Sequence, residues 1–415
     1  MTRSEKVLVN SGSGLLLELV TFLSGIILPR LIIGHYGSEV NGLITSITQF
    51  LGYLTLLQSG VGGVVKAALY KPLEGKDTNA VSRIVKSTDT FFKRLAGVTV
   101  LYLAVLCVVF PFVVEGSFDT WYTVFMILLI GMTTLAQYLF GITYQLVLQA
   151  DQRNYICNVA QIVTIIGNLA VSALLIFLGS SIHMVKLLSG FVFVLRPIAI
   201  HFYARKKYKI DTKVQPDNNA IKQRWYGVGF SVASFVHKKT DVFLLTIFST
   251  LSNVSVYSVY GSVLAGIDSF ISNLTGSFQA AFGNMLARDE RENIKEKFDI
   301  YVFLSNVLVT VVFSVTFLQM IPFVRLYTAK VSDVNYIYPV FAFVISAAEM
   351  SFCLRQPYQA IITAAGHYKQ TSFGAYLEAA INIVLSLALL KPLGLLGIAI
   401  GTLVSMVYRT VDYAV

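Results

Sequence analysis

Charge is scarce in this sequence. Only 13% of its 415 residues are Asp, Glu, Lys or Arg, whereas 55% are hydrophobic and the mean hydropathy is +0.69. This composition lies far outside the usual range of soluble domains and excludes a soluble globular protein. Apolar stretches recur along the whole chain, and each reaches the roughly 20 residues that a helix needs to cross a hydrocarbon core of ~30 Å.

Cysteine and the signatures of enzymes are equally scarce. Cys107, Cys157 and Cys353 stand in or beside apolar stretches without the spacing of a metal site, so we interpret them as small core residues. The sequence holds no phosphate-binding glycine-rich loop, no metal-ligand pair on one helix face and no nucleophile with a base at useful spacing. We therefore expect no enzyme, no metal and no cofactor.

What the sequence has instead is a series of long apolar segments. Because a backbone in lipid must satisfy its own hydrogen bonds, we expect these segments to be helices. The predicted fold is an all-α integral membrane protein of about twelve transmembrane helices. The segments lie near residues 8–33, 40–64, 91–114, 121–147, 155–178, 182–203, 226–249, 254–283, 298–322, 335–362, 371–391 and 394–415.

Lysine and arginine collect in alternate loops. Loops 65–94 and 204–225 hold seven each and loop 284–297 holds four, whereas the intervening loops hold few. The positive-inside rule places these loops and both termini on the cytoplasmic side of a plasma membrane. The net charge of +10 then reflects topology and contact with membrane lipids, and it does not indicate a nucleic-acid partner.

An internal repeat divides the chain into two halves. Each half has an even number of spans, so we predict a parallel repeat: two six-helix lobes, residues 1–203 and 226–415, around a central cavity. Residues 204–225 form the basic cytoplasmic linker, and the last segment meets the end of the sequence without a polar tail, as in a truncated chain. A shift of 214 residues aligns Tyr144 with Tyr358, Ala150 with Ala364, Asn168 with Asn382 and Ser172 with Ser386, and a shift of 213 aligns Arg196 with Arg409.

Ionisable side chains inside the predicted spans are the most informative residues. Each costs about 2.5–3.5 kcal/mol at the bilayer centre, so it is expected to face the protein interior. His237, Lys238 and Asp241 fall within one sector of about 100° on a helix, and we expect them to line one cavity. His237 can titrate near neutral pH, and Lys238 offers a point charge for phosphate. The alternative is an ion-pair network that only holds helices together.

Other ionisable residues lie at similar depth. Glu18 and Arg30 belong to the first span, Asp268 to the eighth, and Glu349 and Arg355 to the tenth. Arg196 and Arg409 occupy matched places in the last span of each lobe, which predicts one shared structural role for both.

Further patterns appear near both ends of the sequence. With them, the chain resembles the Wzx-type polysaccharide flippases of the multidrug, oligosaccharidyl-lipid and polysaccharide exporter superfamily over essentially its whole length. The patterns are Asn10 with Leu28-Pro29-Arg30-Leu31 and Tyr36-Gly37, then Leu354-Arg355-Gln356-Pro357, the run from Ala364 to Thr371, Glu378 to Asn382, and Tyr408 to Asp412.

The resemblance implies a flippase that carries polyprenyl-pyrophosphate-linked oligosaccharide from the inner to the outer leaflet for capsule or exopolysaccharide synthesis. Polysaccharide polymerases and glycosyltransferases are the implied partners, and alternating access is the implied mechanism. His237, Lys238 and Arg355 would line a cationic cavity, and we add Arg30 to this set. Asp241, Asp268 and Glu349 are candidate carriers of a coupling cation or proton, and Glu18 is a candidate for the same role or for an ion pair.

Rival classes differ in what they require. A drug or metabolite exporter of the same superfamily shares the fold and the acidic residues, but its substrates are usually cationic, so it is kept as the alternative. A major-facilitator transporter would carry a Gly and Asp-Arg-Gly-Arg type signature in loop 65–94, which is missing. A membrane polymerase or ligase would need an extended outer loop with catalytic residues, and the outer loops are short. A scaffold would leave the charges in the spans without a purpose.

Overall fold

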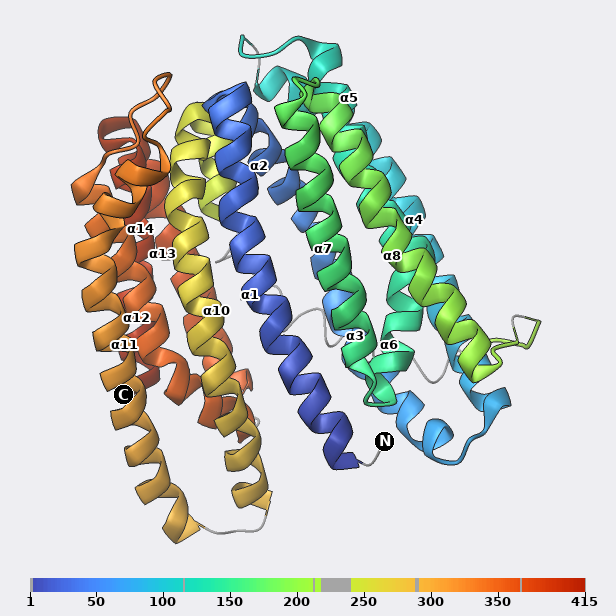
Figure 1. Cartoon of the computed structure of the whole chain (residues 1–415). Coiled ribbons are helices and arrows are strands. Elements are labelled where there is room, and N and C mark those ends of the chain that lie inside the picture. Colours follow the sequence, from blue (N-terminus) through green and yellow to red (C-terminus); the bar gives the residue numbers. More distant parts are fainter. Residues whose placement is uncertain are drawn as a thin grey trace. The chain divides into compact units, whose positions relative to one another are not determined.

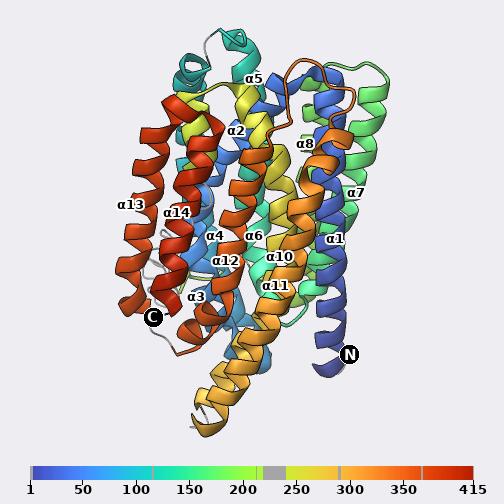
Figure 2. The same ribbon diagram turned by 90° about the vertical axis from the view of Figure 1, so that its left-hand side faces the viewer.

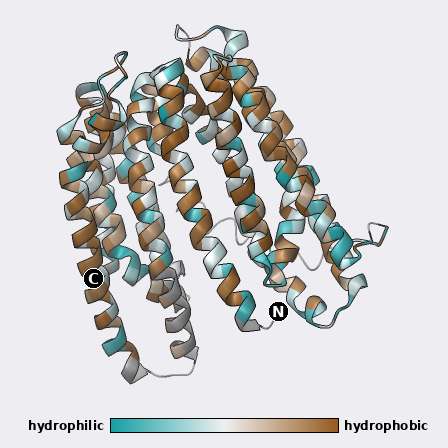
Figure 3. Cartoon of the chain, viewed as in Figure 1, coloured by the Kyte–Doolittle hydropathy of each residue, from teal (hydrophilic) through white to brown (hydrophobic). Residues whose placement is uncertain are grey.

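The computed structural model of the chain describes residues 3–114, 116–211, 213–217, 240–287, 291–365 and 368–414. This part contains thirteen α-helices and one π-helical turn, and it contains no strand. Nine of its helical segments are long and apolar enough to cross a membrane, and Figure 3 shows apolar residues along most of their length. The chain is an all-α multi-pass membrane protein, as predicted.

These nine segments match nine of the predicted spans. Predicted span 40–64 is a pair of helices, α2 (Ser38–Gly52) and α3 (Leu54–Glu74), and predicted span 335–362 is α12 (Pro339–Ala364). Most of predicted span 226–249, including His237 and Lys238, lies outside the described residues. The number of twelve spans therefore stays a prediction.

The chain divides into two compact units. The first comprises Met1–Tyr36 and Leu43–Val232, and the second comprises Gly37–Gly42 and Ala233–Val415. Apart from α2 and α3, the helices of the first unit are α1 (Arg3–Tyr36), α4 (Thr78–Val113), α5 (Thr120–Ala136), the π-helical turn η1 (Gln137–Gly141), α6 (Ile142–Ala150), α7 (Asn154–Phe177) and α8 (Ile182–Tyr208). Besides α12, those of the second unit are α10 (Leu251–Ala287), α11 (Arg291–Tyr327), α13 (Tyr368–Leu393) and α14 (Leu395–Ala414) (Figure 1). The start of α2, up to Gly42, also belongs to the second unit.

Short polar side chains set where several helices begin. The Asp77 carboxylate accepts from the Ala80 N–H at 2.9 Å before α4, and Asp119 accepts from the Trp121 N–H at 3.0 Å before α5. Ser181 does the same for Met184 at the start of α8. Each cap satisfies an N–H that has no partner within its own helix.

Predicted loops 65–94 and 284–297 are largely helical in their described residues, which corrects the sequence-based boundaries. Only residues 75–77 separate α3 from α4, although 65–94 was predicted as a loop, and α10 and α11 likewise extend into predicted loop 284–297. Lysine and arginine are good helix formers and keep their charges in water. A helix can therefore continue beyond its apolar stretch, and hydropathy alone underestimates its length.

Helix limits recur at the shift of 214 residues. The repeat therefore extends beyond single identities to the lengths of the elements. The matched ends are Val113 of α4 with Tyr327 of α11 and Ala150 of α6 with Ala364 of α12, and the matched starts are Asn154 of α7 with Tyr368 of α13.

Two backbone interruptions distinguish the first unit from this pattern. Tyr53 separates α2 from α3, whereas α10 is continuous, and η1 interrupts the helix that corresponds to α12. Hydroxyl groups satisfy the carbonyls near the first interruption: Tyr102 donates to Phe50 O at 3.0 Å and Tyr138 to Leu54 O at 3.0 Å. Inside a membrane such donors are what makes a broken helix tolerable.

Glycines bring α13 and α14 into close contact in the second unit, where the two helices run side by side (Figure 2). A Cβ at Gly397 would collide with the Leu389 carbonyl, and a Cβ at Gly401 would collide with Ser386. The shift of 213 places Met184 and Leu188 at these positions in α8. The same helix pair in the first unit is therefore not built on glycine.

Candidate functional site

Asp241 lies at the centre of a buried polar cluster in the second unit. Its carboxylate accepts from Tyr257 Oη at 2.7 Å, from Thr402 Oγ1 at 2.8 Å and from Asn382 Nδ2 at 3.5 Å. Only 7% of Asp241 is exposed. Three side chains from other helices thus fix the position of the Asp241 carboxylate within the second unit.

A second acidic group lies between α10 and α12. One ligand atom each of Asp268, Glu349 and Cys353 lies within 4.8 Å of the others, a spacing that could hold a metal ion. Asp268 Oδ1 accepts from Gln356 Nε2 at 3.1 Å and from Ser272 Oγ at 2.9 Å. The structure thus brings together two of the four predicted acidic residues. Cys353 is buried, as expected of a core residue.

Arg355 belongs to a buried ion-pair network. Its Nη1 donates to Glu378 Oε1 at 2.7 Å, and the other oxygen of Glu378 lies 3.6 Å from Arg409 Nε. Arg409 also pairs with Asp412, and its Nη2 donates to Thr371 O at 2.7 Å. One carboxylate therefore holds two guanidinium groups from α12 and α14. Sequence reasoning quoted Glu378 only as part of a motif and missed this role.

The first unit holds the remaining predicted residues. Glu18 is half-buried and Arg30 is exposed, and both lie on α1. Twelve residues of helix separate them by about 18 Å along the axis, so they do not form one site together.

Arg196 differs from its repeat partner. Its Nη2 donates to Gln145 Oε1 at 3.3 Å, while its Nε is buried without a hydrogen-bond partner. Within the described residues no carboxylate pairs with Arg196, and the expectation of one shared role for Arg196 and Arg409 is wrong. Lys186, on the same helix α8, also has no acidic partner in the described part and was missed by sequence reasoning.

An ion-pair cluster fixes the polar end of α1. The Asp151 carboxylate contacts Lys6 Nζ at 3.3 Å and Arg153 Nε at 2.6 Å, and accepts from Tyr208 Oη at 2.6 Å. Burial raises the pKa of Asp151, but the Tyr208 hydrogen bond and the two positive charges outweigh it, so the pKa lies below its ordinary value. Asn10, part of the opening motif, adds a bond from its Nδ2 to Gln152 O at 2.9 Å.

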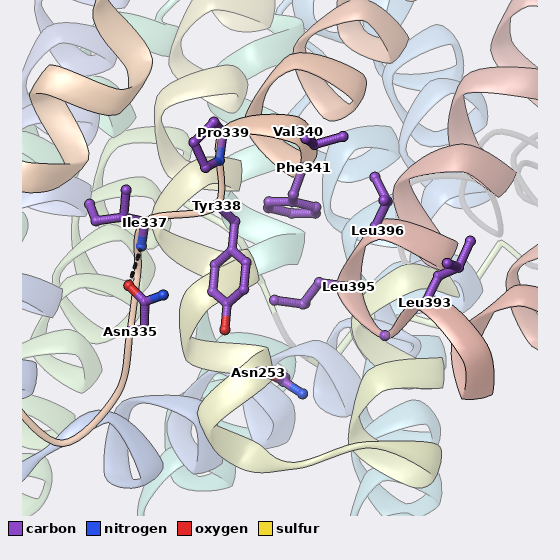
Figure 4. A pocket seen from close by; sticks show the side chains of 11 residues that line it. Asn253, Asn335, Ile337, Tyr338, Pro339, Val340, Phe341, Leu393, Leu395 and Leu396 are labelled. Carbon is purple, nitrogen blue, oxygen red and sulfur yellow. Dashed lines mark hydrogen bonds between the residues drawn. The ribbon is translucent and has the colours of Figure 1, made fainter.

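A pocket of about 360 Å³ opens at one end of the second unit (Figure 4). Asn253, Asn335 and Tyr338 contribute its polar atoms, and Leu395 and Phe341 are among its apolar residues. None of its lining residues is charged. This pocket therefore does not fit an anionic substrate.

Solved structures with the same arrangement of helices identify the fold. An inward-facing MATE multidrug transporter of the MOP superfamily matches with a TM-score of 0.72 at 12% identity, over 94% of this chain and 92% of its own. The lipid II flippase MurJ matches with a TM-score of 0.66 at 14% identity, over 98% of this chain and 86% of its own. The chain has the MOP superfamily fold.

A eukaryotic MATE transporter, AtDTX14, shares the MOP fold as well, with a TM-score of 0.65 at 13% identity over 99% of this chain and 94% of its own. These structures are of transporters and a flippase, not of enzymes. No protein-family model matches the sequence, and curated proteins give no significant match. The likeness to solved structures thus establishes the MOP fold and leaves the substrate to be argued from the residues.

Proposed function

We propose that this chain is a flippase that moves polyprenyl-pyrophosphate-linked oligosaccharide from the inner to the outer leaflet by alternating access. The observation that carries the proposal is the presence of Arg196 and Lys186 on a membrane-spanning helix with no acidic partner among the described residues. A cation in this environment is unfavourable unless an anion balances it. A pyrophosphate or an acidic sugar supplies that anion, and the MOP fold includes a flippase of a lipid-linked precursor.

His237, Lys238, Arg355 and Arg30 complete the proposed cationic set. The first two rest on the sequence alone, since they lie outside the described residues. Glu378 accepts from Arg355 Nη1 at 2.7 Å, and Arg355 Nε is buried without a described partner, so a substrate phosphate would compete with Glu378 for this guanidinium. We therefore assign Arg355 a transient contact.

We propose that the acidic residues couple transport to the movement of a cation or proton. The group of Asp268, Glu349 and Cys353 has the size to bind a cation or proton, and Asp241 is a second buried carboxylate. Glu18 is kept as a candidate on α1. The proposed setting is a plasma membrane with both termini in the cytoplasm, beside the polymerase and glycosyltransferases that consume and supply the oligosaccharide.

A cation-coupled drug or metabolite exporter is the second candidate. The observation that favours it is the TM-score of 0.72 for the inward-facing MATE transporter; the lipid II flippase has 0.66, and the outward-facing and eukaryotic MATE structures have 0.59 and 0.65. The unpaired cations in α8 count against it, because they repel a cationic drug.

The test is translocation by the full chain in proteoliposomes. A polyprenyl-pyrophosphate-linked oligosaccharide in one leaflet and a cationic dye in the lumen are followed in parallel, with Lys238→Ala and His237→Ala at matched protein levels. We expect flipping of the lipid by the native chain, its loss in the variants, and no dye efflux. Dye efflux without lipid flipping would establish the exporter. Flipping that survives both variants would leave the flippase and remove these two residues from the site.

A further inference from the structure

A polar pocket lies wholly within the first unit, and none of its lining residues belongs to the cationic or coupling sets predicted from the sequence. Its volume is about 480 Å³, inside the range of about 300–1,000 Å³ typical of small-molecule sites. Gln58, Gln137, Gln145, Gln149 and Gln161 line it, and Lys66 and Arg196 supply its charge. It contains no acidic lining residue.

The two interruptions of the first unit border this pocket. The helix that starts after the break at Tyr53 places Gln58, Gly62 and Lys66 at intervals of four residues, so they share one face of α3. The π-helical turn begins with Gln137 and widens the helix just before Gln145. Such turns are frequent at functional sites.

Glycine at one position keeps α8 close to this turn. A Cβ at Gly141 would lie 2.9 Å from Cβ of Pro197, the residue after Arg196. At the shift of 214 the second unit has Arg355 in place of Gly141. The first unit thus lacks one guanidinium of the network described above.

The first unit also has no carboxylate at the repeat position of Glu378. Glu378 of the second unit corresponds to Thr164 in α7, whose hydroxyl donates to Ala160 O at 2.8 Å. Arg409 has Glu378 and Asp412 as partners, whereas among the described residues Arg196 has the Gln145 amide as its partner and an Nε without one. A partly buried guanidinium with an unsatisfied N–H is stabilised by binding an anion.

The glutamines add a preference for hydroxyl groups. Gln137 Nε2 donates to Gln145 Oε1 at 3.5 Å, and the side chains of Gln58, Gln149 and Gln161 make no hydrogen bond to another described residue. Each amide carries two N–H donors and a carbonyl acceptor, which match the paired donor and acceptor of sugar hydroxyls. A ligand with one anionic group and several hydroxyls would pair with the positive charges of the pocket and with the hydrogen-bonding groups of its glutamines.

We propose that this pocket binds an anionic sugar, with Arg196 and Lys66 on its phosphate or carboxylate and the glutamines on its hydroxyls. The proposal deepens the proposed function by locating a headgroup site, and it rests on that function for placing the pocket on a transport route. A guanidinium binds phosphate and carboxylate alike, through two parallel hydrogen bonds. The two anions are therefore separated by experiment.

The experiment is calorimetric titration of the purified full chain with glucose 1-phosphate, glucuronate and glucose. We expect both anionic sugars to bind at least ten-fold more tightly than glucose. Arg196→Gln removes this preference by weakening the anionic sugars about ten-fold or more, the loss expected for a hydrogen bond to a charged group. Gln161→Leu weakens all three sugars. Tighter binding of glucose 1-phosphate assigns the phosphate end of the substrate, and tighter binding of glucuronate assigns an acidic sugar unit.

Gln359→Leu is the control for Gln161→Leu, because it makes the same change in the second unit, outside the pocket. It should leave all three affinities unchanged. Three results would each overturn the proposed sugar site: no binding of any sugar, equal binding of glucose and the anionic sugars, or unchanged affinities in Arg196→Gln. Thermal unfolding of every variant within a few degrees of the native chain excludes misfolding as the cause.

The lipid translocation assay keeps the two proposals apart. Flipping of lipid-linked oligosaccharide without sugar binding would overturn the pocket and leave the flippase. Sugar binding that depends on Arg196, without flipping of any such lipid, would support the pocket and overturn the flippase.

Discussion

Arg196 and Arg409 occupy matched positions in the repeat but have opposite surroundings. Arg409 is 2% exposed and shares Glu378 with Arg355, and Gly374 leaves room for its guanidinium. Arg196 faces glutamine amides in a pocket and has no described carboxylate. At this pair of positions, the second unit therefore pairs its arginine with a carboxylate of its own, and the first unit leaves a positive charge for a ligand. A symmetric sequence pattern does not imply a symmetric function.

The largest effect should come from the carboxylate that holds the second unit together. Glu378→Gln leaves the buried Arg355 with a neutral partner and Arg409 with Asp412 as its described acid, and breaking a buried ion pair costs about 3–5 kcal/mol of folding stability. We expect a large fall in the midpoint of thermal unfolding in detergent, or loss of folded protein on size exclusion. Thr164→Val at the matched position of the first unit should change this midpoint little. Equal effects of the two changes would remove the contrast between the units.

Adding a carboxylate to the first unit at the repeat position of Glu378 should test whether the missing acid is what leaves Arg196 open to an anionic ligand. Thr164→Glu places an acid at the repeat position of Glu378, and we expect it to compete with an anionic ligand for Arg196. Anionic sugar affinity and lipid flipping should fall about ten- to a hundred-fold, which corresponds to roughly 1.4–2.7 kcal/mol. Thr164→Gln has nearly the same size without the charge and should retain most of both activities. A loss as large in Thr164→Gln would make the effect one of packing.

The interruptions of the first unit should depend on hydroxyl groups that a continuous helix does not need. Tyr138→Phe removes the hydroxyl that donates to the Leu54 carbonyl at 3.0 Å, and the loss of a typical hydrogen bond costs about 0.5–1.5 kcal/mol. The unfolding midpoint should fall accordingly, and hydrogen exchange of α3 should rise. Tyr376→Phe on the exposed face of α13 should change neither. An unchanged midpoint in Tyr138→Phe would show that the break is stable without this bond.

The smallest effect should be a pH dependence confined to the first unit. Asp151 has Ala365 as its repeat counterpart, so only the first unit carries an acid at this turn. Because the pKa of Asp151 is lower in the fold than its ordinary value of 3.8, its charge stabilises the fold above that value. The gain, about 1 kcal/mol for a partly exposed group, is lost as pH falls from about 4 through the folded pKa. Asp151→Asn should unfold at lower temperature at pH 7 and should lose this part of the acid dependence; an identical pH profile would contradict the assignment.

The sequence predicted the helical class and most spans, because apolar length alone decides them. It did not predict the break at Tyr53, where no proline marks the chain, or the helical extensions through 65–94, where charged residues are also good helix formers. The acidic pair of Asp268 and Glu349 was foreseen as a set of residues, but their approach depends on how α10 packs on α12. Aligning the two halves of the sequence at a shift of 214 residues places Thr164 opposite Glu378. That alignment could have predicted that no described acid pairs with Arg196.

The π-helical turn makes the pocket depend on the number of residues as well as on their chemistry. If the same five residues of Gln137–Gly141 continued as an ordinary α-helix, every following side chain of α6 would be rotated by about 100° relative to α5. Gln145 and Gln149 would then face another direction with no change in residue type. Among related chains, the spacing between Gln137 and Gln145 is therefore a heritable character in its own right, and a comparison of residue identities alone would overlook it.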